Sequence, residues 1–205
     1  MIRHLVLSPH TDDIEISMYG LIKQSPNEIF DIVNISNGGN FDDSSGNIRV
    51  DECKQFWKNT NLPNVNIYFL DVPAIGDCKE DALVNMIETE FDLKQYNTVF
   101  TTSDRDRHFE HRIINSVAWT LVRRSQIGLI EYQGWSSKMD YIPNYFVNVT
   151  DIIDEKVQLL LTSFDSQVKK GLLSKSKIKA FHKNFYTLNN GVEYCENFRI
   201  LLTYK

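Results

Sequence analysis

One imidazole and two adjacent carboxylates follow the first apolar run of the sequence, since His10, Asp12 and Asp13 come directly after residues 5–7. The three-residue spacing of His10 and Asp13 across a tight strand-to-helix turn lets a ring nitrogen and a carboxylate oxygen converge on one metal ion. Asp12 then stays beside the ion as a general base for a water molecule. One alternative is open for this segment alone: the two aspartates cap a helix, and His10 hydrogen-bonds in the turn.

A second segment favours the metal interpretation. His108 and His111 form an i, i+3 pair at the start of a predicted helix, so their side chains project from nearly the same face. Three of the five histidines lie in these two segments, although the mixed charge of residues 104–111 also suits a solvated loop. A His/Asp/His set leaves one position open, as in catalytic zinc sites. The spare histidine of the pair is then available to stabilise an oxyanion or to protonate a leaving amine.

The elements that must position these residues follow an alternating pattern. Four apolar runs of strand length alternate with four amphipathic stretches of helix length, which is typical of a parallel sheet covered by helices on both faces. The runs are residues 2–7, 30–35, 65–70 and 98–102, and the stretches are 15–23, 49–58, 80–91 and 111–124. Both histidine segments then lie at the carboxyl ends of strands, where ligands collect in open α/β sheets.

The second half of the sequence departs from this regular alternation of strands and helices. It predicts strands at 128–132, 145–149 and 194–203 and a helix at 152–164, while a turn-rich stretch at 36–40 follows the second strand of the first half. The 205 residues, 42% of them hydrophobic, contain no linker, repeat or low-complexity tract. We therefore expect a single domain spanning residues 1–205.

Charge and cysteine usage narrow the class of protein. A net charge of −5 argues against a nucleic-acid partner, because phosphate binding usually shows as a basic face. The three cysteines have no CxxC spacing, which argues against a disulfide framework and a thiolate zinc site and indicates a reducing compartment. The sequence has neither an apolar run long enough to span a membrane nor a signal-peptide pattern. The expected location is the cytoplasm.

Both histidine segments resemble the signatures of a known family. Residues 8–13, SPHTDD, resemble the His-Pro-Asp-Asp signature of the PIG-L/LmbE-like N-deacetylases, and HFEH at 108–111 resembles their His-Pro-Asp-His. The resemblance implies a Rossmann-like three-layer α/β sandwich with a mainly parallel sheet, as in LmbE-like proteins. It also implies that His10, Asp13 and His111 bind Zn²⁺ or another divalent ion and that Asp12 is the general base.

Further positions carry over from the same resemblance. His108 is implied at the oxyanion or leaving group, Glu110 at an acidic position that holds a liganding histidine, and Arg49 near the substrate. The likeness in residue order extends over nearly the whole chain. Departures include Thr11 and the Phe-Glu pair in the second signature, which replace the family's Pro and Pro-Asp. Bulky residues at 18 and 19 stand where the family has a small, Gly-rich stretch, so we expect them to alter the substrate pocket.

The implied activity is removal of an N-acyl group, expected to be acetyl, from an amino sugar or sugar conjugate. The partner would be a small molecule, with a nucleotide or lipid carrier and an oligomeric state both left open. A catalytically inactive sugar-binding relative of the same fold is the alternative. A metal-dependent phosphoesterase ranks last, because such sites more often use two metals and more acidic ligands.

Several other side chains have two interpretations. Trp135 either stacks on a sugar ring or packs against the domain, and Arg105 either grips a phosphate or pairs with a neighbouring aspartate, which we favour. Large aromatic residues are expected in the core, namely Trp119, Tyr194 and Phe198. No function is expected for the two remaining histidines, His4 and His182.

Overall fold

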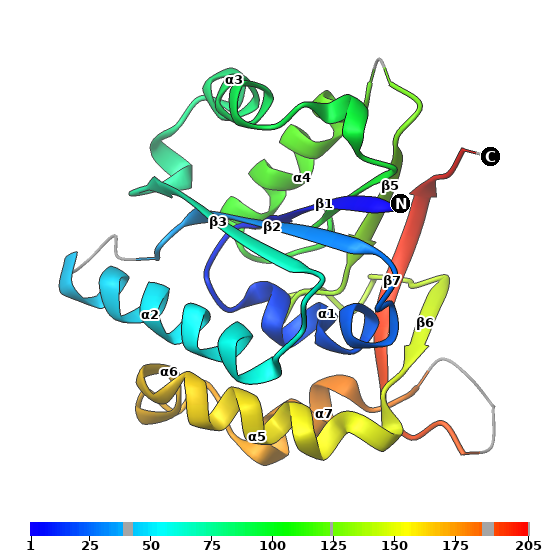
Figure 1. Ribbon diagram of the computed structural model, residues 1–205. Coiled ribbons are helices and arrows are strands. Elements are labelled where there is room, and N and C mark those ends of the chain that lie inside the picture. Colours follow the sequence, from blue (N-terminus) through cyan, green and yellow to red (C-terminus); the bar gives the residue numbers. More distant parts are fainter. Residues whose placement is uncertain (39–42, 124, 186–190, 205) are drawn as a thin grey trace.

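A seven-stranded sheet forms the centre of the protein in the computed structural model, which describes residues 1–38, 43–123, 125–185 and 191–204. The strand order is β3-β2-β1-β4-β5-β7-β6 (Figure 1). The first five strands are mutually parallel, whereas β7 is antiparallel to both of its neighbours. The strands are β1 (Arg3–Ser8), β2 (Ile29–Ser36), β3 (Val65–Val72), β4 (Thr98–Thr101), β5 (Gly128–Tyr132), β6 (Tyr145–Asn148) and β7 (Cys195–Leu202).

Helices cover both faces of the sheet, so the predicted three-layer, Rossmann-like sandwich is confirmed. Figure 1 shows α3 and α4 above the sheet and the other five helices below it. The upper pair is α3 (Glu80–Glu90) and α4 (Phe109–Val122). The lower set is α1 (Asp13–Gln24), α2 (Asp43–Thr60), α5 (Ile153–Ser163), α6 (Asp165–Lys169) and α7 (Lys175–His182), and short 3₁₀ turns occur at η1 (Ile75–Asp77), η2 (Leu93–Gln95) and η3 (Thr150–Ile152). Within the described ranges, no helix combines the length and apolar character needed to cross a membrane.

The alternation of side chains along β1 explains why a continuous apolar run forms its strand. Leu5 and Leu7 pack into the core between the sheet and α3–α4, while Val6 packs into the core on the opposite face. All three are fully buried, because successive strand side chains point to opposite faces and both faces are covered. From Leu5 onward this central parallel strand therefore carries no polar residue until its last position, Ser8.

Element boundaries differ from the sequence-based expectation in ways that matter for the site. Helix α4 begins at Phe109, so His108 immediately precedes the helix and His111 lies in its first turn. Helix α2 begins at Asp43 rather than at residue 49, and the short helix α6 was not predicted. Residues 39–40 of the predicted turn and residue 124 of the predicted fourth helix lie outside the described residues.

One expectation about a bulky side chain is wrong. Trp119 is 42% exposed, because the buried side chains of α4 lie on the face of Ile114, Val117 and Leu121. Phe198, in contrast, is fully buried as expected. Met18 and Tyr19 are buried in the core beneath the sheet, and the cavity beside Asp12 is lined by other residues. These two departures from the family pattern therefore lie in the core, and their effect on a substrate pocket stays a prediction.

An internal ion pair joins the lower helices to the sheet. Lys156 Nζ of α5 donates to Glu196 Oε1 of β7 at 2.6 Å, and both side chains are fully buried. The same carboxylate accepts hydrogen bonds from the backbone N–H groups of Gly20 and Leu21 in α1. A Cβ at position 20 would overlap the Val149 side chain at 2.3 Å, so glycine permits this close approach of α1.

Candidate metal centre and active site

The topology places both histidine segments at one point of the sheet edge. Strand β1 pairs with β2 on one side and with β4 on the other. From β1 the chain adds strands first toward β3 and then, starting at β4, in the opposite direction. Ligands bind at such switch points, beyond the carboxyl ends of the strands. The loop from β1 to α1 carries His10 and Asp12, and the loop from β4 to α4 carries Asp106 and His108.

Three side-chain atoms from these segments converge to form a triangle. His10 Nδ1 and His111 Nε2 each lie 3.4 Å from Asp13 Oδ2, and the two ring nitrogens are 3.3 Å apart. Tetrahedral zinc with bonds of about 2.0–2.1 Å requires ligand atoms about 3.3–3.4 Å apart. The spacing and the N/O donor set therefore fit one divalent ion, and the residues are those expected from the sequence.

The helix-cap interpretation of the first segment is wrong. Asp12 precedes α1, but its side chain accepts no capping hydrogen bond. Its Oδ1 instead accepts from Arg49 Nη2 at 2.7 Å, which brings Arg49 of α2 to the site. The Asp13 carboxylate accepts from the backbone N–H of His10 at 2.9 Å, which closes the turn and aims Oδ2 at both imidazoles.

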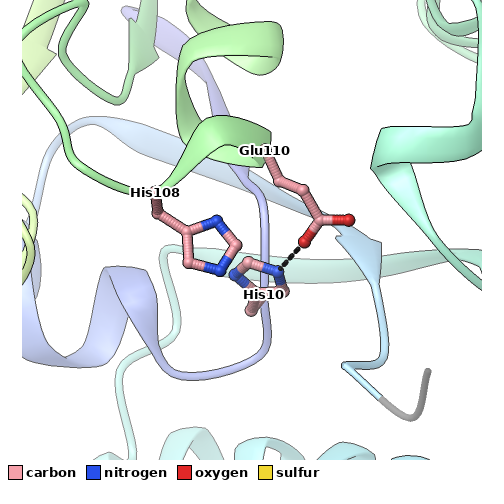
Figure 2. A group of neighbouring side chains, drawn as sticks. All are labelled: His10, His108 and Glu110. Atoms are coloured by element: carbon pink, nitrogen blue, oxygen red, sulfur yellow. Dashed lines mark hydrogen bonds and ion pairs between the residues drawn. The ribbon is translucent and has the colours of Figure 1, made fainter. Parts of the chain in front are cut away.

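A carboxylate also holds the second ring nitrogen of each histidine in the triangle. His10 Nε2 lies 2.8 Å from Glu110 Oε2, across 100 residues of sequence, and Figure 2 shows Glu110 extending from the start of α4 toward the ring. His111 Nδ1 lies 3.1 Å from Asp106 Oδ2. Such partners fix the tautomer and orientation of metal-binding imidazoles. Glu110 thus contacts one imidazole of the triangle, and its other oxygen accepts from the Gly76 backbone N–H.

Asp106 is not among the site residues expected from the sequence. This fully buried residue accepts a hydrogen bond from the backbone N–H of His108 at 2.8 Å and another from Ser136 Oγ, in addition to its contact with His111. It therefore organises both histidines of the second segment. The sequence does contain a signal for it, because Asp106 is an acidic residue between the end of the predicted strand at 98–102 and the histidine pair.

His108 lies beside the triangle without belonging to it. Its ring centroid is 5.0 Å from that of His10 and 4.8 Å from that of His111. His10, His108 and Glu110 form a second group close enough to hold an ion (Figure 2). In that group, however, the Glu110 oxygen and His10 Nε2 are 2.8 Å apart, a hydrogen-bond distance rather than the spacing of two ligands on one ion. We therefore favour the first group.

Electrostatics hold this site in a charged state when no cation is bound. Burial opposes a charge on His10, but hydrogen bonds to Asp13 and Glu110 prevail and raise its pKa to about 9. Burial likewise opposes the charge of His111, while Asp13 and Asp106 raise its pKa to about 10. The hydrogen bond from His10 lowers the pKa of Glu110 to about 2. A cation that binds here must displace two imidazole protons, so its affinity is coupled to pH.

A buried network supports the loop that carries the second segment. Glu131 of β5 accepts from the backbone N–H of Asp104 and from Asn115 Nδ2, while Arg199 of β7 bridges Glu131 and Asp104. Arg105 pairs with Asp104 and with Asp140, as expected for an arginine in such a loop. The loop is thus fixed by side chains from three elements.

A cavity of about 120 Å³ opens beside Asp12 and Asp13. Trp135 contributes to its wall, and its ring lies 5.1 Å from that of Phe181. Trp135 is 37% exposed. Trp135 therefore packs against the protein and also lines the cavity, while its stacking on a sugar ring stays a prediction.

Comparison with solved structures extends the likeness over the whole fold. A conserved protein of Thermus thermophilus has 22% identity and a TM-score of 0.74, covering 100% of this chain and 97% of that one. The N,N'-diacetylchitobiose deacetylase of Pyrococcus horikoshii has 21% identity and a TM-score of 0.69, with coverages of 97% and 83%. The 4-carboxy-2-hydroxymuconate hydratase of Pseudomonas putida has 14% identity and a TM-score of 0.74, with coverages of 100% and 98%. These likenesses show a shared fold, which carries different reactions.

The family comparison covers the site itself. No curated protein matches the chain. The sequence model of the family described as "PIG-L: GlcNAc-PI de-N-acetylase" matches residues 5–122, more than half of the chain. That range includes both histidine segments, their carboxylate partners and the arginine that contacts Asp12. The chain therefore belongs to the PIG-L family.

Proposed function

We propose that this protein is a metal-dependent amide hydrolase that removes an N-acyl group, acetyl in the simplest case, from an amino sugar or sugar conjugate. The observation that carries the proposal is the triangle of His10, Asp13 and His111 donor atoms with the carboxylate of Asp12 beside it. Membership of the PIG-L family supports the same reaction class. A neighbour of the same fold is named as an N,N'-diacetylchitobiose deacetylase.

The roles of the side chains follow from their positions. A divalent ion held by His10, Asp13 and His111, with zinc favoured by the donor set, would polarise the amide carbonyl and lower the pKa of a water molecule. Asp12 would take the proton from that water, and Arg49, 2.7 Å from its Oδ1, fixes the orientation of the carboxylate. Arg49 thus acts on the proposed base, whether or not it also touches substrate.

His108 would act on the carbonyl oxygen of the amide rather than on the attacking water. Its imidazole would donate an N–H to the oxygen that becomes negative as the carbonyl is attacked. The C–N bond then breaks, the amine leaves with the proton that Asp12 removed from water, and the acyl group leaves as a carboxylate. Burial and the charges of His111 and His10 lower the pKa of His108, and a neutral imidazole still has one N–H to donate.

Amine release from a panel of N-acylated amino sugars tests the proposal. The zinc-loaded wild type should release amine, and Asp12→Asn should lower kcat at least about 100-fold, in keeping with the loss of a general base. Asp154→Asn is the matched control, because Asp154 is exposed and pairs with Lys175 and Lys179 rather than with a histidine of the site. Metal content and circular dichroism of each variant confirm that only the base has changed.

Absence of amine release from every member of the panel by correctly folded, metal-loaded protein would contradict the proposal. Binding of the same sugars without turnover, unaffected by Asp12→Asn, would instead favour the inactive sugar-binding alternative. We propose further that residues 1–205 act as one domain in the cytoplasm on a small-molecule substrate. Whether the sugar carries a nucleotide or lipid, and whether copies of the chain associate, are open in this proposal.

A further inference from the structure

We propose that the cavity beside Asp12 and Asp13 binds the acyl chain of the substrate and accepts chains longer than acetyl. The inference rests on the proposed amide hydrolysis and names the substrate class more narrowly. The position of the cavity is the first observation. Its wall includes the proposed base and one proposed metal ligand, so a group that occupies it must be attached close to the reacting carbonyl.

The lining of the cavity is the second observation. Ile16, Trp135, Leu172 and Leu173 contribute apolar side chains, and Gln167 is the one polar residue beside the two aspartates. The Gln167 amide Nε2 already donates to Ser166 Oγ at 3.0 Å. A buried hydroxyl that loses water without gaining a partner is destabilised by about 1–3 kcal/mol. The hydroxyl-covered ring of a sugar therefore fits this lining poorly, whereas an alkyl chain fits it well.

The polar side of the site lies elsewhere. Arg49 contacts Asp12 from α2, and its buried Nε has no hydrogen-bond partner within the described residues. Arg49 is absent from the lining of the cavity. Asp12 therefore has a polar side, formed by Arg49, and an apolar side, formed by the cavity. The sugar hydroxyls fit the polar side and the acyl chain fits the apolar side.

The wall of the cavity is held in place by specific contacts. Both oxygens of Glu52 in α2 accept hydrogen bonds from Ser166, one from its N–H at 2.6 Å and one from its hydroxyl at 2.7 Å. The carbonyl oxygen of Gln167 accepts from the N–H groups of Leu172 and Leu173. Gly171 adopts a φ of 70°, a left-handed conformation that favours glycine, at the turn just before these leucines. The apolar wall is thus a preformed part of the fold.

Volume is the third observation. The cavity measures about 120 Å³. An engineered apolar cavity of about 150 Å³ in another protein holds a six-carbon benzene ring. The single methyl group of an acetyl chain would fill a small part of the space available here. A chain with two additional methylenes, as in butyryl, would bury more apolar surface against Ile16, Leu172 and Leu173.

A chain-length series tests the inference. N-acetyl-, N-propionyl-, N-butyryl- and N-hexanoylglucosamine are compared as substrates of the zinc-loaded protein, with a hexyl glycoside of N-acetylglucosamine as the control for an apolar aglycone. Each buried methylene should raise kcat/KM about fourfold, so butyryl should exceed acetyl about 15-fold. Leu172→Trp, which fills the cavity from a half-exposed position, should bring the butyryl-to-acetyl ratio close to one. Ile142→Trp, at a 72% exposed position outside the cavity, should leave the ratio unchanged.

A second measurement does not depend on turnover. The carboxylate products are titrated into the zinc-loaded protein by calorimetry, and butyrate should bind about 15-fold more tightly than acetate. If no amide is cleaved, the proposed function fails while this titration still decides about the cavity. Equal binding of acetate and butyrate would overturn the inference. So would a chain-length ratio that is flat in wild type, one that survives Leu172→Trp, or a gain found only with the hexyl glycoside.

Discussion

Replacing Asp106 with asparagine should weaken zinc binding by about 10- to 100-fold, although Asp106 contacts no metal itself. Asp106 Oδ2 lies 3.1 Å from His111 Nδ1, and the same carboxylate accepts from the N–H of His108 at 2.8 Å. Asparagine can keep the bond to His108 but then presents an NH₂ group to His111 Nδ1. Two donors would face each other unless the imidazole proton moves to Nε2, which is the atom that points at Asp13.

The expected loss corresponds to about 1.4–2.7 kcal/mol of binding free energy, at 1.36 kcal/mol per factor of ten. Competition with a chromophoric zinc chelator at fixed pH measures it, and far-UV circular dichroism with urea unfolding verifies the fold. Asp154→Asn is the control, because this exposed carboxylate meets Lys175 and Lys179 rather than a residue that supports the site. Wild-type zinc affinity in a folded Asp106→Asn protein, or an equal loss in both variants, would refute the tautomer argument.

Three further perturbations test other parts of the structure. Lys156→Met leaves the buried Glu196 carboxylate without its cation and should lower the free energy of unfolding by about 3–5 kcal/mol in urea titrations. Burial and the Lys156 charge lower the pKa of His182 well below its usual range, so below about pH 6.5 the unfolded chain takes up a proton that the folded protein excludes. Stability should therefore fall by up to about 1.4 kcal/mol per pH unit on acidification, and His182→Gln should remove this slope from unfolding curves at about pH 6.5 and 5.5. Glu110→Asp is one methylene too short to reach both His10 Nε2 and the Gly76 N–H, and zinc affinity should fall by up to about tenfold in the chelator assay.

Each of these perturbations has a contrary outcome. Lys23→Met removes a partly exposed pair with Glu155 and should cost less than about 1 kcal/mol, so a similar loss in Lys156→Met would contradict the importance of burial. An unchanged pH slope in His182→Gln would show that other groups cause the acid sensitivity. Full zinc affinity in Glu110→Asp would mean that one of its two contacts is sufficient.

Local patterns predicted the parts of the fold that depend on local physics. The fully buried run in β1 and the amphipathic face of α4 both follow from the periodicity of side chains, so the layered architecture could be predicted. The same periodicity failed for Trp119, because a large apolar residue one position beyond the buried face still resembles a core residue in sequence. Helix α6 spans five residues, which is too short to show a clear helical pattern.

The candidate site was predictable for a different reason. Three histidines in two segments after strands were enough to suggest one site, because parallel strands end at the same edge of a sheet. The carboxylates that hold the imidazoles were harder to assign. Glu110 reaches His10 across 100 residues, and only the packing of α4 against the loop after β1 determines that pairing. The catalytic roles of Asp12 and His108 stay predictions until they are tested by mutation.

The position of β7 has a consequence for how the protein matures. This strand follows all the others in sequence, yet it lies inside the sheet between β5 and β6, and its Arg199 braces the loop before His108. During synthesis, the histidine segments emerge long before the strand that completes their support. A nascent chain should therefore acquire its full affinity for a cation only after β7 has inserted, which links metal acquisition to the final stage of folding.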